Sequence, residues 1–186
     1  MTTNQQIILN TLLDQQKKQL DSTLKEDEYF HLFITEQVLK NFELSYDELQ
    51  EGIVDNGGDG GIDAIYTFVN SELIQRDTEL IDGKRNSVID IYLIQSKNTN
   101  GFGETPIEKC TSSANDLFDF TKSSEQLKTV YNNELLINRE VFKNQYLHLA
   151  SKFPILKFHY FYASKGNEVH ENVRRKVENL REIINK

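Results

Sequence analysis

Asp63, Gln95 and Lys97 are the side chains whose chemistry and order along this chain indicate a reaction centre. Hydrolysis of a phosphodiester needs a cation that neutralises the phosphate and lowers the pKa of a bound water, and Mg²⁺ prefers oxygen ligands. Asp63 would supply a carboxylate, Gln95 a neutral amide oxygen and Ser96 a backbone carbonyl. Lys97 would orient the attacking water or stabilise the developing negative charge.

Two predicted strands would position these residues. Residues 55–61, D-N-G-G-D-G-G, hold four glycines and predict a sharp turn, directly followed by a strand over 62–69. Apolar and polar residues alternate over 88–96, so Gln95 and Lys97 continue the apolar face of a second strand. If the two strands are neighbours in the sheet, Asp63 at the start of the first strand lies close to Gln95 and Lys97.

Each of these residues alone is compatible with an ordinary structural role. Asp63 can cap a turn, Gln95 can satisfy a strand edge, and Lys97 can end a strand in solvent. Together, the glycine-rich turn, the acid at the strand entry and the apolar strand ending in Gln-x-Lys are independent requirements met in the right order. The combination favours a site.

Glu36 is a candidate fourth member of this site, as a metal ligand. It lies on a helix predicted over 27–40, four residues after Leu32 and three after Phe33, so it would share their inward-facing side. An acid in that position requires a metal or another cation. For this residue taken alone, the pattern favours an ordinary structural role.

Periodicity and capping signals predict the other elements. Ser45 and Glu48 form a capping-box pattern for a short helix that Gly52 ends, and Thr105 with Pro106 begins a longer helix. Further elements are an amphipathic helix over 5–24 with Ile8, Leu12, Leu20 and Leu24 on its apolar face, a hairpin connection over 71–87, a helix over 133–152, a strand over 155–163, and a helix after Asn167. This order predicts an α/β domain whose small mixed sheet is covered by helices on both faces.

Composition narrows the class of protein. A chain of 186 residues with 38% hydrophobic content can bury one sizeable core. No apolar run approaches the ~18 residues of a membrane span, and the single cysteine, Cys110, excludes an internal disulfide and suits a buried helical stripe better than a nucleophile. We therefore expect a cytoplasmic protein with no membrane partner. The net charge of −8 opposes nucleic-acid binding by bulk electrostatics, although a local basic patch decides contact.

Two segments resemble a known family. D-G-G-I-D-A-I-Y (59–66) and I-Y-L-I-Q-S-K-N (91–98) resemble the Mrr branch of the PD-(D/E)xK nucleases, and more narrowly the N-terminal domain of abortive-infection phage-resistance (AIPR) proteins. The resemblance implies a restriction-endonuclease-like domain over 26–186 behind an N-terminal helical extension over 1–25. It also implies a Mg²⁺-dependent DNA endonuclease of phage defence, with Mn²⁺ as an alternative cation.

The resemblance assigns roles residue by residue. Asp63 matches the aspartate of the motif, Gln95 its acidic or glutamine position, and Lys97 its lysine, while Glu36 matches an upstream helical acid. Gln95 departs from the glutamate of the wider family, as in the Mrr branch, and a neutral amide should hold a metal more weakly than a carboxylate.

Other interpretations stay open. The chain can be a nuclease-like fold that has lost catalysis and acts as a DNA-binding or oligomerisation module, or an adaptor whose glycine turn only shapes the backbone. A homo-oligomer and a longer parent protein, continuing beyond the final helix, also stay open. No phosphate-binding loop occurs. The four histidines lack the H-E-x-x-H spacing of a zinc site, so each is expected to be a surface or packed residue: His31, His148, His159 and His170. Basic residues near the end either contact DNA or form a solvated face: Lys165, Arg174, Arg175, Lys176 and Arg181.

Overall fold

The computed structural model describes residues 2–20, 22–54 and 57–185. The helices are α1 (Asn4–Gln19), α2 (Glu26–Leu39), α3 (Tyr46–Glu51), α4 (Thr105–Leu117), α5 (Asn133–Leu149) and α6 (Glu171–Ile184). Short 3-10 helices are η1 (Lys40–Phe42), η2 (Ser124–Gln126) and η3 (Ala150–Lys152). The strands are β1 (Ala64–Val69), β2 (Glu72–Ile74), β3 (Val88–Lys97) and β4 (Ile155–Ser164).

The strands form one mixed sheet in the order β2-β1-β3-β4. β1 pairs antiparallel with β2 and with β3, so that Ala64 lies opposite Ile94. β4 runs parallel to β3, and α4 and α5 lie in the crossover that parallel neighbours require. The register places Gln95 beside Tyr162. As a result, the start of β1 and the ends of β3 and β4 meet at one end of the sheet.

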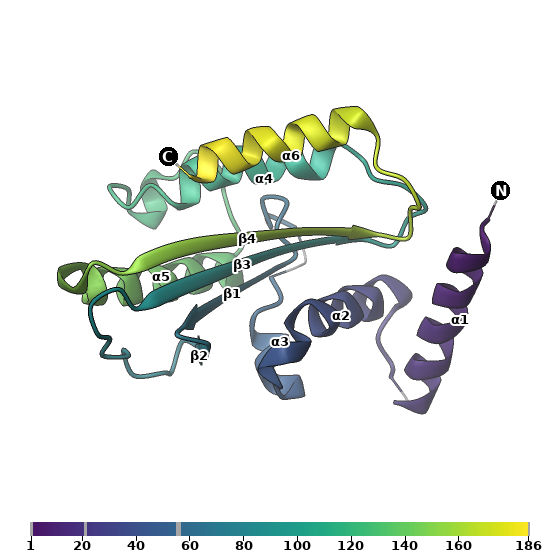
Figure 1. Cartoon of the computed structure of the whole chain (residues 1–186), viewed down its shortest axis with the longest axis horizontal. Coiled ribbons are helices and arrows are strands. Elements are labelled where there is room, and N and C mark those ends of the chain that lie inside the picture. The colour runs from purple at the N-terminus through teal and green to yellow at the C-terminus, as the bar shows by residue number, and fades with distance from the viewer. Residues whose placement is uncertain (1, 21, 55–56, 186) are drawn as a thin grey trace.

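Helices cover both faces of the sheet, with α4 and α6 on one side and α2 and α3 on the other (Figure 1). On the first side, Ile89, Ile91 and Leu93 of β3 pack with apolar residues of α4, α5 and α6. On the second side, Ile94 packs with residues of α2 and α3 in a smaller core. These layers confirm the prediction of a small mixed sheet flanked by helices. Among the described residues, no helix is both long and apolar enough to cross a membrane.

The prediction of a helix near the N-terminus is confirmed, but the helix ends at Gln19 and not at residue 24, and its predicted apolar face is wrong. Three of the four expected members of that face are exposed: Ile8, Leu12 and Leu20. The face that contacts the rest of the protein contains Leu13, which packs with Phe30 and Phe33 of α2. It also contains Gln6, whose Nε2 donates to the carbonyl of Lys165 at 2.8 Å.

Most of the remaining local predictions are confirmed. α3 has the Ser45 capping box and ends at Gly52, and Cys110 is buried in α4, where burial raises the pKa of its thiol to about 12. Two details differ. Thr105, which the capping pattern predicts as the N-cap before Pro106, already belongs to α4, and the N-cap is Glu104. The connection between β1 and β3 contains β2, a strand too short to show a pattern in the sequence.

Candidate active site

The glycine-rich turn brings Asp63 to the start of β1. Gly60 and Gly61 have φ angles of +63° and +82°, in the left-handed region that suits glycine. A Cβ on Gly61 would lie only 2.7 Å from the carbonyl oxygen of Pro106 on α4. The turn can therefore lie against α4 only without a side chain at this position. Positions 55 and 56 of the predicted turn lie outside the described residues.

Main-chain hydrogen bonds hold Asp63 beside β3. Its N–H donates to the carbonyl of Ile94 at 2.8 Å, and its carbonyl accepts from the N–H of Val54 at 2.9 Å. The residue is 3% exposed. Both bonds continue the pairing of β1 beyond its first residue, so the position of the carboxylate depends on the sheet and not on a loose loop.

The end of β3 supplies the nearest partners of this carboxylate. Asp63 Oδ2 accepts a hydrogen bond from Gln95 Nε2 at 2.6 Å and another from the Ser96 N–H at 2.7 Å. Lys97 Nζ lies 4.0 Å from Asp63 Oδ1, and the lysine side chain is 42% exposed. The structure thus brings the predicted Asp63, Gln95 and Lys97 together, with Ser96 between the last two.

Glu36 is not placed with this set. It is exposed on α2 and lines a cavity of about 490 Å³ with Leu44, Tyr46 and Leu49. The cavity lies between α3 and the connection from α1 to α2. Burial raises the pKa of the neighbouring Tyr29 hydroxyl, and the charge of Glu36 adds to this effect. The predicted inward direction of Glu36 is therefore not observed.

His31 is the α2 residue that reaches the site. Its Nδ1 lies 3.8 Å from Asp63 Oδ2, and its side chain is 11% exposed. Glu36 follows His31 by five residues, which turns it about 140° further around the helix. Because no metal-binding spacing surrounds His31, the sequence predicted a surface or packed histidine at this position. Its place between Phe30 and Leu32 in an apolar stripe was the available signal, since a buried imidazole needs a polar partner.

The atoms at this site suit a hard cation held by one carboxylate. Asp63 offers carboxylate oxygen and Ser96 a carbonyl oxygen, whereas Gln95 turns its Nε2 toward both and would offer oxygen only after its amide turns over. Mg²⁺ commonly uses one or two carboxylates, with water and substrate phosphate completing its shell. Over the described ranges, no group of three or more His, Cys, Asp or Glu side chains could hold a metal ion. The residues fit a cation that receives several ligands from outside the protein.

Two tyrosines of β4 border the site. Burial raises the pKa of Tyr160 and of Tyr162, and the charge of Asp63 makes a smaller contribution in the same direction. Tyr162 Oη accepts from the N–H of Gly103 at 3.0 Å, which ties β4 to the loop before α4. Both phenols therefore stay protonated at neutral pH, and their rings lower the local dielectric constant around Asp63.

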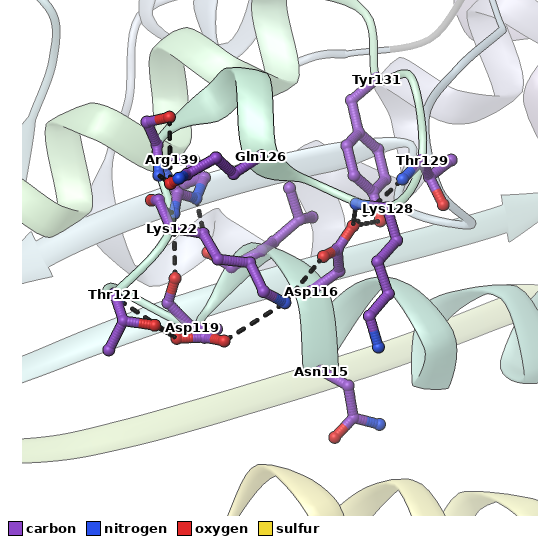
Figure 2. Close-up of polar contacts among 12 residues, drawn as sticks. Asn115, Asp116, Asp119, Thr121, Lys122, Gln126, Lys128, Thr129, Tyr131 and Arg139 are labelled. Carbon is purple, nitrogen blue, oxygen red and sulfur yellow. Dashed lines mark hydrogen bonds and ion pairs between the residues drawn. The ribbon is translucent and has the colours of Figure 1, made fainter.

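A second buried carboxylate, Asp116 of α4, lies in a separate polar cluster (Figure 2). Its Oδ2 accepts from the N–H of Lys128 at 2.8 Å and from Tyr131 Oη at 3.3 Å, and its Oδ1 accepts from Lys122 Nζ at 3.1 Å. Burial alone would raise the pKa of Asp116, but its hydrogen bonds and Lys122 lower it overall. This Asp116 cluster holds the connection between α4 and α5.

Ion pairs involve several of the basic residues near the C-terminus. Lys176 lies 3.3 Å from Glu104 and 2.5 Å from Glu108. Two more pairs form within α6, between Arg175 and Glu171 at 3.1 Å and between Arg181 and Glu178 at 3.8 Å. These contacts agree with the solvated-face interpretation of the helix.

Similarity to known proteins does not supply an assignment. No protein-family model, curated protein or solved structure matches this chain. A functional proposal therefore depends on the geometry around Asp63 and on the two sequence segments that carry its neighbours.

Proposed function

We propose that the chain is a metal-dependent phosphodiesterase with a restriction-endonuclease-like core of the PD-(D/E)xK type, acting on DNA. The observation that supports this most directly is the convergence of Asp63, Gln95 and Lys97. They come from two antiparallel strands, and a carboxylate, an amide and an ammonium group lie together at one end of the sheet. An ordinary structural role for each residue separately would not require this convergence.

Each residue has a distinct task in this proposal. Asp63 and Gln95 hold the cation, and Ser96 adds its carbonyl oxygen while its N–H keeps the Asp63 carboxylate oriented. Bound Mg²⁺ or Mn²⁺ would supply charge neutralisation at the phosphate and a more acidic water. Lys97, whose side chain is 42% exposed, can reach a phosphate oxygen or the attacking water from the solvent side.

The DNA substrate and the role in phage defence come from the family resemblance of the two motifs. Net charge is −8, so contact with a phosphate backbone requires cations at the site itself. Lys97 is one such group.

DNA cleavage tests the proposal. Purified protein is incubated with supercoiled and linear DNA in the presence of Mg²⁺ or Mn²⁺, in parallel with Asp63→Ala, Lys97→Ala and the surface control Lys128→Ala. We expect the parent and Lys128→Ala to cut and the two site variants to fail. Cleavage by Lys97→Ala at the parental rate would refute the assigned roles, even if the fold is as proposed.

One observation favours a second candidate function, a nuclease-like fold without catalysis that serves as a DNA-binding or oligomerisation module. Gln95 is neutral, and its Nε2 and the Ser96 N–H both donate to Asp63 Oδ2, which already stabilises the carboxylate without a cation. Titration calorimetry with Mg²⁺ and Mn²⁺ separates the two candidates. Absence of binding that depends on Asp63 would support the module.

A further inference from the structure

Among the residues that the structure describes, three histidines lie beside an aspartate, and one pair differs from the other two. His148 Nε2 lies 2.8 Å from Asp82 Oδ1, and His159 Nε2 lies 2.7 Å from Asp90 Oδ1. Both distances are those of a direct hydrogen bond. His31 Nδ1 and Asp63 Oδ2 are 3.8 Å apart, too far for a hydrogen bond between these two atoms.

The separation in the third pair is short enough for both groups to bind one cation. Imidazole nitrogen and carboxylate oxygen each lie about 2.0–2.2 Å from a bound divalent metal, so two such ligands can be up to about 4.2 Å apart. The His31–Asp63 distance is inside that limit. Lys97 Nζ, at 4.0 Å from the other carboxylate oxygen, also stays beyond direct hydrogen-bond contact.

The fold holds His31 in this position independently of any cation. Its neighbours Phe30 and Phe33 are buried in the cluster between α1 and α2. One turn before His31, Asp27 Oδ1 accepts from Asn98 Nδ2 at 2.8 Å, and Asn98 directly follows Lys97. The first turn of α2 is therefore attached to the end of β3, which keeps the imidazole beside the carboxylate.

We infer that His31 is a nitrogen ligand of the cation held by Asp63, so that the site prefers Co²⁺ and Mn²⁺ to Mg²⁺. The inference rests on the proposed function and names its cation. Imidazole binds transition metals well, whereas Mg²⁺ prefers oxygen, and affinity at a given site rises from Mn²⁺ to Co²⁺. With Gln95 neutral, the imidazole contributes affinity that a second carboxylate would otherwise supply.

Cation binding measured without DNA tests the inference. CoCl₂, MnCl₂ and MgCl₂ are titrated separately into the whole chain by calorimetry, for the parent, His31→Gln, Asp63→Asn and the control His148→Gln. We expect His31→Gln to weaken Co²⁺ binding about 10-fold or more while changing Mg²⁺ binding much less. Asp63→Asn should weaken all three cations, and His148→Gln should match the parent.

The outcomes separate this inference from the proposed function. Binding that depends on Asp63 but loses Co²⁺ and Mg²⁺ affinity equally in His31→Gln would overturn the role of His31 and leave the nuclease proposal intact. Binding of no cation through Asp63 would overturn both. Preferential loss of Co²⁺ affinity supports both.

A second measurement on the unmodified protein covers the case in which His31→Gln does not fold. Co²⁺ bound to an imidazole shifts or broadens the NMR resonances of that ring. We expect this for His31 as CoCl₂ is added, with His148 and His170 unchanged. Unmoved His31 resonances at saturating Co²⁺ would overturn the inference.

Discussion

Asp63 and Asp116 are both buried carboxylates beside a lysine, but their surroundings differ. Lys122 Nζ lies 3.1 Å from Asp116 and is mostly covered, with 22% of its side chain exposed. Lys97 Nζ lies 4.0 Å from Asp63, with 42% of its side chain exposed. Asp116 is in direct contact with its lysine and holds a loop in place. Asp63 has its lysine and imidazole neighbours beyond direct hydrogen-bond distance.

The partners of the two carboxylates also come from different parts of the chain. Asp116 is bound by residues of the connection that directly follows its own helix, between Lys122 and Tyr131. Asp63 is surrounded by residues of α2 and β3, far from it in sequence. A local cluster stabilises one loop, whereas a cluster assembled from several elements depends on the whole fold.

The largest difference between the two regions is expected in catalysis. Lys97→Ala should reduce the rate of metal-dependent DNA cleavage by about 100- to 1000-fold, because it removes a charge positioned for the transition state. Lys122→Ala should leave the rate within about three-fold below its unfolding temperature, since the Lys122 ammonium binds Asp116 and Asp119 and not the Asp63 centre. Single-turnover cleavage assays measure both. An equal loss in the two variants would remove the functional distinction between the clusters.

The stability of the folded state should show the opposite order. Asp116→Asn should lower the free energy of unfolding by about 3 kcal/mol, because an amide N–H₂ would face the Lys122 ammonium at a buried site. Asp63→Asn should lower it by less than about 1 kcal/mol, since its side-chain oxygen still accepts from Gln95 and Ser96 while Lys97 can move into solvent. Urea denaturation without divalent cations compares the two. A larger loss in Asp63→Asn would reverse the assignment of a structural role to Asp116.

Acid should weaken the Asp116 cluster selectively. The pKa of Asp116 in the folded protein is lowered from 3.8, so its contribution to stability is complete above the unfolded pKa and is lost as pH falls through the folded value. The stability difference between the parent and Asp116→Asn should therefore be constant from pH 7 to 5 and shrink below about pH 4. Urea denaturation at each pH measures it. A difference that persists unchanged at pH 3 would contradict this linkage.

Within the Asp116 cluster, the smallest effect is expected at Tyr131. Tyr131→Phe removes the hydroxyl that donates to Asp116 Oδ2 at 3.3 Å, and the Lys128 N–H continues to bind the same oxygen. We expect a loss of about 0.5–1.5 kcal/mol in the free energy of unfolding. Thermal denaturation checks it, with Tyr46→Phe on the exposed side of α3 as the control. A loss as large as that of Asp116→Asn would mean that the Tyr131 hydroxyl, and not Lys122 or the Lys128 N–H, provides most of the stability of the Asp116 cluster.

The sheet was predictable because its signals are local. The alternation of apolar and polar residues over β3 identified the strand face that continues into Gln95 and Lys97. The glycine-rich segment predicted the bend before Asp63. Antiparallel pairing of β1 with β3, which are separated in the chain only by the short β2 and its connections, then brings the residues together. These predictions needed no knowledge of how the helices pack.

The helices were harder, because periodicity gives an angle on a helix but not the neighbour at that angle. On α1, Leu9 and Leu13 have the same spacing as Ile8 and Leu12, and only contacts with α2 decide between the two stripes. On α2, the sequence favoured Glu36 for its charge. The side of the helix that meets β3 carries His31, and only the tertiary structure shows it.

The mixed direction of the sheet also has a consequence for the order of folding. β1 and β3 pair across a short stretch, from Val69 to Ile89, whereas β3 and β4 first pair between Val88 and Ile155, across about three times as much chain. Closing the longer loop costs about 1 kcal/mol more conformational entropy. The antiparallel pair that unites Asp63 with Gln95 is therefore favoured to form early, before β4 docks, and changes in β4 should slow the completion of folding more than the assembly of the Asp63 centre.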